Sequence, residues 1–270
     1  MSTLLLRLAG PFQSWGVQSR FTERDTLLEP SKSGVIGLLC AALGRKRHEP
    51  LDDLNRLKMG VRGDREGVLK MDYHTAGGTH TIREAEKYYV AKADGTRPEP
   101  GKGAVESRRY YLADADFLVG LEGDDEVLLR CLDRALARPR WPLYLGRKAF
   151  VPGAPIRLEY RPLDLPGPPD VPGLVHLSLE EALRRYPWMA RTPKEKERKL
   201  KELSKAGGKL HLRLVLEADP GATAEVRPDQ PISFEVHNRL YSLRYVRTDY
   251  QELTPAMIEE ERHVSLPAVA

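Results

Sequence analysis

Cysteine is scarce in this chain of 270 residues, and a long apolar run is absent. Its two cysteines, Cys40 and Cys131, each lie in an apolar helical pattern, which predicts buried thiols and excludes a disulfide framework or a cysteine metal site. No run approaches the roughly 18 to 20 apolar residues of a membrane span, and MSTLLLRLAG lacks the basic leader of a signal peptide. We therefore expect a cytoplasmic protein with no membrane contact, metal or cofactor.

The chain also lacks a strong net charge, but its charges are unevenly distributed. The formal net charge is only +4, which by itself decides little. Residues 184–213 carry eleven Lys or Arg against three Glu, and residues 138–161 carry six against one. Such clusters are typical of proteins that bind polyanions, above all nucleic acid. The alternative is a solvated helix face with no partner.

Apolar periodicity predicts an α+β domain in the first 160 residues. The expected elements are strand 3–10, helices 33–43 and 51–58, strand 58–64, strand 108–123, helix 124–139 and strand 155–160. This is the element order of a ferredoxin-like or RRM-type domain. Residues 67–107 interrupt it with a polar stretch that is long for a connection and is therefore expected to be functional or disordered. The Pro-rich stretch 161–173 predicts a linker or crossing segment before a smaller, basic C-terminal domain, 161–270.

The start of the helix at 33–43 carries an unexpected lysine. Lys32 lies between Ser31 and Ser33, where the partial positive charge of a helix start disfavours a cation. No glycine pair at P-loop spacing precedes Lys32, which excludes that kind of NTPase site. Free backbone N–H groups, two hydroxyls and an ammonium can together bind a phosphate or a carboxylate. The alternative is that a serine caps the helix and Lys32 points into water.

Other candidate residues combine aromatic, polar and basic side chains. Gln13 and Trp15, with Phe12, are expected to be exposed after the first strand, where they could contact unpaired bases; alternatively, Trp15 caps the core. Two later stretches, ESRRYYL and YLGRKAF, mix cations with tyrosines, as single-stranded RNA binding requires. The candidates there are Arg108, Arg109, Tyr144, Arg147 and Lys148.

Tyr73 and His74, in MDYHTAGGTH, are the candidates for chemistry. No Asp, Glu or Cys set accompanies them to complete a metal site. They could cleave RNA by metal-free acid–base chemistry. The alternative is a stacking or hydrogen-bonding pair at the base of a loop.

Four of these stretches together resemble one family. GPFQSWG, PSKSGVIGLLCAALG, DYHT and YLGRK, in this order, are similar to the CasD family, RAMP-superfamily subunits of the type I-E CRISPR Cascade complex. The resemblance implies an RRM-like domain over 1–160, with an inserted β-hairpin thumb at about 74–107 and a smaller C-terminal part. It covers most of residues 1–150.

The resemblance also implies partners and roles in antiviral defence. It implies binding to the 5′ handle of CRISPR RNA in a ribonucleoprotein complex, at the end of a filament of backbone subunits. It further implies contact with the large subunit, and through it indirectly with target DNA. By position, Lys32 would hold a handle phosphate, Tyr73 and His74 would lie at the thumb base, and Arg147 and Lys148 would face RNA.

Relatives of this kind differ in whether they cut RNA. The chain resembles the non-cutting branch, so the resemblance implies a binding subunit without catalytic residues. A metal-free endoribonuclease that processes CRISPR repeats with Tyr73 and His74 is the alternative.

Overall fold

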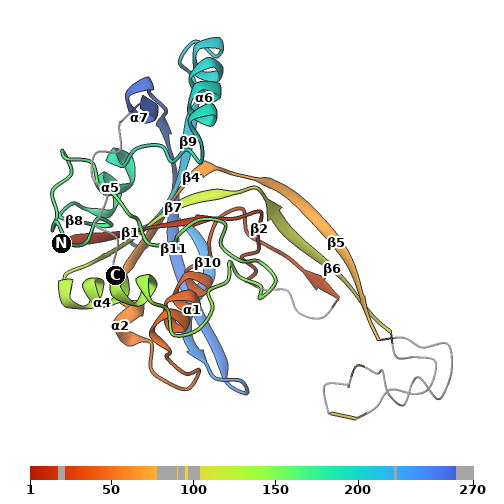
Figure 1. Cartoon of the computed structure of the whole chain (residues 1–270). Coiled ribbons are helices and arrows are strands. Elements are labelled where there is room, and N and C mark those ends of the chain that lie inside the picture. Colours follow the sequence, from red (N-terminus) through yellow and green to blue (C-terminus); the bar gives the residue numbers. More distant parts are fainter. Residues whose placement is uncertain (18–21, 78–89, 91–94, 97–103, 222–223, 260–270) are drawn as a thin grey trace.

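One antiparallel sheet of seven strands organises the protein, in the order β10-β11-β9-β4-β7-β1-β8 (Figure 1). The computed structural model describes residues 1–17, 22–77, 90, 95–96, 104–221 and 224–259. The strands are β1 (Ser2–Ala9), β4 (Lys58–Arg65), β7 (Asp116–Gly123), β8 (Leu174–Val175), β9 (His211–Glu217), β10 (Glu225–Phe234) and β11 (Arg239–Glu252). The helices are α1 (Lys32–Leu43), α2 (Asp52–Asn55), α4 (Glu126–Ala137), α5 (Leu179–Arg185), α6 (Pro193–Lys205) and α7 (Pro255–Glu259).

Both faces of this sheet are covered, which explains the unbroken apolar run of β1. Leu4, Leu6 and Leu8 belong to the cluster that includes the apolar side chains of α1 and α4. Leu5 points to the other face and packs in the cluster of α5. A strand buried on both faces has no polar alternation, so Leu4, Leu5 and Leu6 follow one another, and Arg7, the exception, forms an ion pair with Asp116.

The predicted helices form, with small differences. α1 begins after Ser31, whose hydroxyl accepts from the N–H of Gly34, and ends at Gly44, whose φ is 74°. The helix predicted at 51–58 is a single turn, α2. In α4 the face that packs on the sheet centres on Leu129, Leu132 and Leu136. Cys131 is therefore half-buried rather than buried as predicted.

Two strand predictions are corrected. The predicted strand 108–123 is two strands, β6 (Val105–Ala113) and β7, separated by a turn in which Asp114 has a φ of 60°. Residues 155–160 form no strand; Arg157 makes only an isolated bridge to Leu6, and β8 pairs with β1 instead. Prolines at 152, 155 and 162 supply no N–H group to a ladder, which explains why this segment only crosses β1.

A two-stranded arm projects from the body (Figure 1). β5 (Val68–Ala76) pairs with β6 from Val68–Ala113 to Ala76–Val105. On the body side, β2 (Phe12–Gln13) and β3 (Glu23–Arg24) pair with the other edge of β6. The arm begins before the thumb predicted at 74–107, of which 78–89, 91–94 and 97–103 lie outside the described residues.

The C-terminal part of the chain completes the same sheet. β9 pairs with β4 over Gly60–Gly63, so the sheet continues across the predicted boundary at residue 160. The Pro-rich stretch 161–173 is a structured crossing segment: the Arg161 guanidinium donates to the carbonyl oxygens of Gly167, Pro168, Val171 and Leu174. The division into two folding units stays a prediction. Among the described helices, none has the length and apolar character required to traverse a bilayer.

Burial makes Cys40 a probe of unfolding. Desolvation in α1 raises the pKa of its thiol to about 11, so at pH 8 the reactive thiolate is scarce. We expect iodoacetamide to modify the half-buried Cys131 first and Cys40 only when the chain unfolds. Peptide mass spectrometry over a labelling time course checks this order. Equal labelling rates in the folded protein would contradict it.

Candidate nucleic-acid interface

The twelve residues predicted to bind RNA fall into two groups in space. Five lie in the body: Gln13, Trp15, Ser31, Lys32 and Ser33. Seven lie on the arm or in the loop beside it: Tyr73, His74, Arg108, Arg109, Tyr144, Arg147 and Lys148. RNA contact by each of them stays a prediction.

The predicted exposure of Gln13 is wrong, and for Trp15 the alternative, a place in the core, is confirmed. Gln13 is 0% exposed, and its Nε2 donates to the carbonyl oxygens of Leu8 and Ala115. Trp15 is 1% exposed and donates from Nε1 to the Gln13 Oε1 at 3.1 Å. A Cβ at Gly34 would lie 2.7 Å from the Trp15 ring. The motif GPFQSWG therefore packs on PSKSG, and both build the core beneath the interface.

Lys32 is also buried, and the chain's own carboxylates occupy the anion site at the helix start. Its side chain is 1% exposed and its Nζ lies 3.0 Å from the Glu217 Oε2, whereas its backbone N–H donates to Asp229 at 2.8 Å. Burial lowers the pKa of Lys32, and Glu217 opposes that shift. Arg244 binds Asp229 and lies 3.7 Å from Glu217. Lys32 thus joins α1 to the three C-terminal strands.

Three arginines gather at the root of the arm instead. Arg24 of β3 is the register partner of Arg109 on β6, and the Arg147 Nη2 donates to the Arg24 carbonyl oxygen at 3.1 Å. The pKa of Arg109 is lowered mainly by burial and next by the charge of Arg24. The pKa of Arg147 is lowered mainly by burial and next by the charges of Arg109 and Arg24. The charge of Asp72 opposes both shifts and that of Asp25 opposes the shift of Arg147, but neither arginine has a side-chain hydrogen bond to a carboxylate among the causes of its shift. Like charges held this close to one another favour the binding of an anion.

A tight loop holds Arg147 in this cluster. Gly146 has a φ of 91°, and a Cβ there would lie 1.7 Å from the Ser14 carbonyl oxygen. The Ser14 N–H donates to Leu145, and the Phe150 N–H donates to Arg147. Glycine is therefore required in YLGRK because no side chain fits between this loop and β2.

Aromatic rings adjoin the arginines. Phe12, Tyr111 and Phe150 have ring centroids 5.1 to 5.8 Å apart, and the Arg147 guanidinium lies 5.7 Å from the Phe150 ring centre. Phe12 remains 41% exposed. Tyr111 shares a face of β6 with Arg109, because alternate strand residues point the same way. Exposed rings beside cations can stack bases while the cations bind phosphates.

Tyr73 and His74 do not form one site. They are consecutive on β5 and therefore point to opposite faces of the arm. Tyr73 is 54% exposed, and its hydrogen bond to Glu106 raises its pKa. His74 shares the face of Arg109, and its Nδ1 is buried without a hydrogen-bond partner among the described residues. In that part of the chain, no group of three His, Cys, Asp or Glu is placed to hold a metal.

The remaining predicted residues lie around this cluster. Arg108 points to the other face and binds Glu23 at 3.0 Å, Tyr144 is half-buried and Lys148 is exposed. Arg24 was missed because Glu23 and Asp25 flank it, so counting charges along the chain hides it. Only the pairing of β3 with β6 shows that Arg24 lies beside Arg109.

Two solved structures are similar to this chain over most of its length. A solved structure titled "CRISPR RNA-guided surveillance complex" contains a chain with 37% identity and a TM-score of 0.70, covering 93% of this chain and 90% of that one. Another, "Crystal structure of Cas protein", has 41% identity and a TM-score of 0.62, covering 92% and 94%.

Sequence comparisons confirm the resemblance to the CasD family. "CRISPR system Cascade subunit CasD" of Escherichia coli (strain K12) is 34% identical over 161 residues, 55% of this chain and 66% of that protein, so the match spans slightly less than two thirds of the relative. The family model "CRISPR-associated protein (Cas_Cas5)" matches residues 3–247. The chain therefore belongs to the Cas5 family of CRISPR-associated proteins.

Proposed function

We propose that this chain is a non-catalytic subunit of a Cascade-type CRISPR surveillance complex and binds the 5′ handle of the CRISPR RNA at the root of its arm. The observation that carries the proposal is the cluster of Arg24, Arg109 and Arg147, whose mutual repulsion an RNA backbone would relieve. Phe12 and Tyr111 add rings that unpaired bases can stack on. The names of the relatives support the choice of RNA as the polyanion.

The body of the protein supports an RRM-like interpretation. Four strands in the order β8-β1-β7-β4, with α1 after β1 and α4 after β7, follow the ferredoxin-like pattern. In this interpretation β8 takes the place of the fourth strand, and the arm is an insertion between the second and third. β9, β11 and β10 then extend the sheet beyond its ordinary edge.

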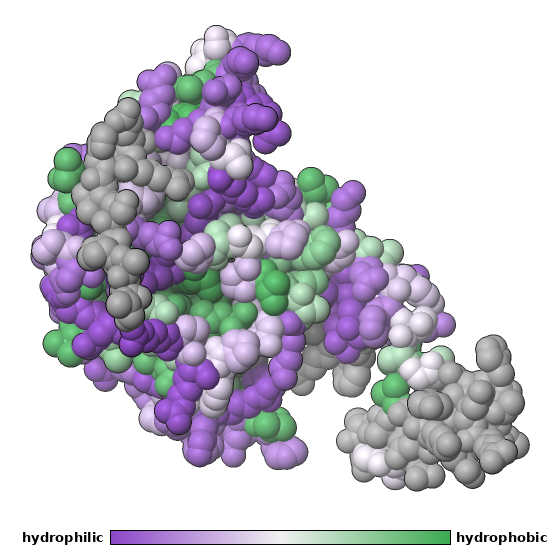
Figure 2. Space-filling view, in the orientation of Figure 1, coloured by the Kyte–Doolittle hydropathy of each residue, from purple (hydrophilic) through white to green (hydrophobic). Residues whose placement is uncertain are grey.

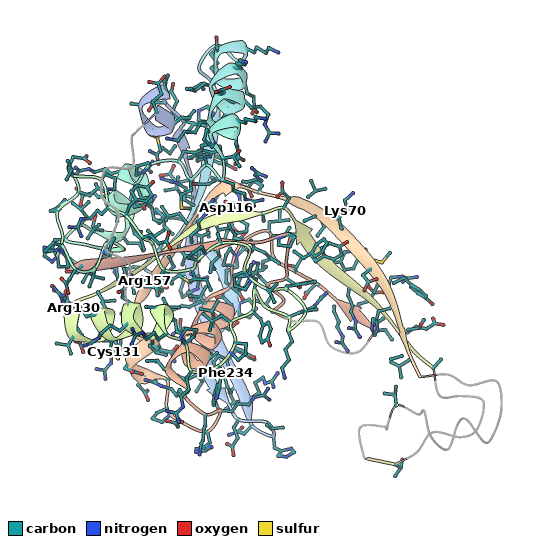
Figure 3. The ribbon with its side chains drawn as sticks, viewed as in Figure 1. Lys70, Asp116, Arg130, Cys131, Arg157 and Phe234 are labelled. Carbon is teal, nitrogen blue, oxygen red and sulfur yellow. The ribbon has the colours of Figure 1, made fainter. Side chains whose placement is uncertain are left out.

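The arm supports contacts with other subunits. Val68, Leu69, Met71 and Tyr73 are each at least 45% exposed on a ribbon of only two strands. Such ribbons are marginally stable alone, and exposed apolar groups on them favour a protein partner. Lys70 lies on the same arm, far from Asp116 and Arg157 in the body (Figure 3). We assign the arm to a neighbouring backbone subunit, with the large subunit and target DNA reached through the assembled complex.

Binding of handle RNA by the purified full chain tests the proposal. A labelled RNA with the natural handle is compared with an RNA of equal length in which the handle is scrambled. We expect tighter binding of the natural handle, and recovery of CRISPR RNA when the chain is purified after expression with its neighbouring subunits. Equal affinity for both RNAs, together with no recovered CRISPR RNA, would refute the assignment.

Cleavage of repeat RNA in the presence of EDTA tests the endoribonuclease alternative. Because Tyr73 and His74 point to opposite faces, they cannot act as paired acid and base on one phosphate. We expect intact repeat RNA after prolonged incubation with excess protein. Site-specific cleavage that His74→Ala abolishes would replace the binding function with the catalytic one.

A further inference from the structure

The basic helix α6 lies apart from the arginine cluster. In Figure 1, α6 lies at the top of the molecule, above the place where β5 and β6 leave the body, whereas β2 lies below that place. Its tip is hydrophilic, as the purple surface at the top of Figure 2 shows. Because the arginine cluster does not include α6, RNA binding at the root of the arm gives no role to the strongly basic stretch that contains this helix.

One side of α6 fixes the helix to the body. Thr192 caps its start and Pro193 is its first residue. Leu203 is 3% exposed and packs with Trp188, whose Nε1 donates to the Asp64 carbonyl oxygen at 3.0 Å. Glu195, also buried, forms an ion pair with Arg65. α6 is therefore held rigidly, and its opposite side must face outward.

Four cations form a straight stripe on that outward side. At 100° per residue, Lys194, Arg198, Lys201 and Lys205 lie within a sector of about 60°, directly opposite Leu203. All four are exposed, and the Arg198 side chain is 74% exposed. Their nearest acids flank the stripe: Glu197 on one side, and Glu202, which binds Lys199 at 3.3 Å, on the other. The closest carboxylate to Arg198 is Glu195, at 3.9 Å.

We propose that this stripe binds the phosphate backbone of a DNA duplex, without reading its sequence. From Lys194 to Lys205 the helix rises roughly 16 Å, a length over which a DNA duplex presents about ten phosphate charges. α6 has no aromatic residue to stack an unpaired base, unlike the arm root. Rigid, evenly spaced cations without rings fit the regular backbone of a duplex better than a flexible single strand. This goes beyond the handle-binding function, in which DNA is reached only through other subunits.

Charge-removing variants of the full chain test the proposal. The first changes Lys194, Arg198, Lys201 and Lys205 to Gln. A matched control changes four other exposed cations, Lys46, Arg47, Arg56 and Lys58, to Gln. Both variants lose four positive charges, so any effect of net charge alone is equal in the two.

The probe is a mixed-sequence 30-base-pair DNA duplex, titrated between 50 and 200 mM salt. Four phosphate contacts contribute about 3.6 to the slope of log affinity against log salt, so over this range the wild type should lose about 150-fold more affinity than the α6 variant. The control should keep the wild-type slope. Equal slopes for the two variants would overturn the proposal.

Handle RNA, titrated in parallel, separates this proposal from the handle-binding function. The α6 variant should bind handle RNA like the wild type. Loss of handle RNA by the α6 variant, with duplex binding unchanged, would place the RNA on α6 and overturn the duplex proposal. Failure of the wild type to bind handle RNA would refute the handle function and leave the duplex result standing.

Discussion

Arg109→Gln combined with Arg147→Gln is expected to weaken handle-RNA binding by about 100-fold. Each arginine contributes a charged hydrogen bond to phosphate, worth on the order of tenfold or more in affinity. The slope of log affinity against log salt should fall by about 1.4, because each phosphate contact with a single strand contributes about 0.7. Fluorescence anisotropy at several salt concentrations measures both quantities.

The same double variant should not destabilise the free protein. Burial and the charge of Arg24 lower the pKa of both arginines, and the charge of Arg109 further lowers that of Arg147, so their removal relieves an unfavourable charge interaction in the folded chain. We expect the free energy of unfolding, from urea titration, to stay constant or rise. A residue selected for binding differs in this way from one selected for folding.

Arg47→Gln combined with Arg56→Gln is the matched control, because both side chains are exposed and lie away from the arm. It should leave handle binding within twofold of the wild type. Wild-type RNA affinity in the Arg109 and Arg147 variant would place the RNA elsewhere. A parallel loss of stability and affinity would make these arginines structural.

Lys32→Met should show the opposite behaviour. The methionine retains most of the side-chain volume but leaves Glu217 without its ammonium partner, and breaking a buried pair from one side typically costs about 3 kcal/mol. Arg244 remains 3.7 Å from Glu217, so we expect a loss of about 2 to 3 kcal/mol in the free energy of unfolding. The salt slope of handle-RNA binding should not change.

Adding Glu217→Gln to Lys32→Met should restore part of the lost stability, because the uncompensated carboxylate is removed with its partner. Glu217→Gln alone serves as the third corner of this cycle. Unchanged stability in Lys32→Met, with a salt slope lower by about 0.7, would show that Lys32 binds RNA phosphate. That outcome would require α1 to separate from β9.

The sequence predicts elements whose causes are local, and α1 is the clearest. Its apolar residues, the Ser31 cap and the Gly44 end all lie within one stretch, and the predicted span 33–43 is nearly the observed one. Lys32 could not be understood in the same way, because its partners Glu217 and Asp229 are more than 180 positions away. Local residues predicted an anion site there, and distant residues supply the anion.

Strand prediction failed where no face is buried. In β5, Leu69, Met71 and Tyr73 alternate with polar residues, but this short run stands in the polar stretch 67–107 and its apolar side is exposed rather than packed on a core. The opposite error occurred at 155–160, where alternation is present but the chain only crosses β1. Apolar periodicity shows which side of a segment would face a core. It does not show whether a neighbouring strand has a free edge with which the segment can form hydrogen bonds.

The pairing of β9 with β4 has a consequence for the order in which the chain can fold during synthesis. β4 ends at residue 65, but the strand that covers its outer edge ends at residue 217, about 150 residues later. Until that strand emerges from the ribosome, β4 presents an open edge that could pair with another chain. The ammonium of Lys32 likewise cannot pair with Glu217 until residue 217 has been synthesised. Late closure of this kind has a large contact order, so we expect slow folding and a nascent chain that depends on protection from aggregation.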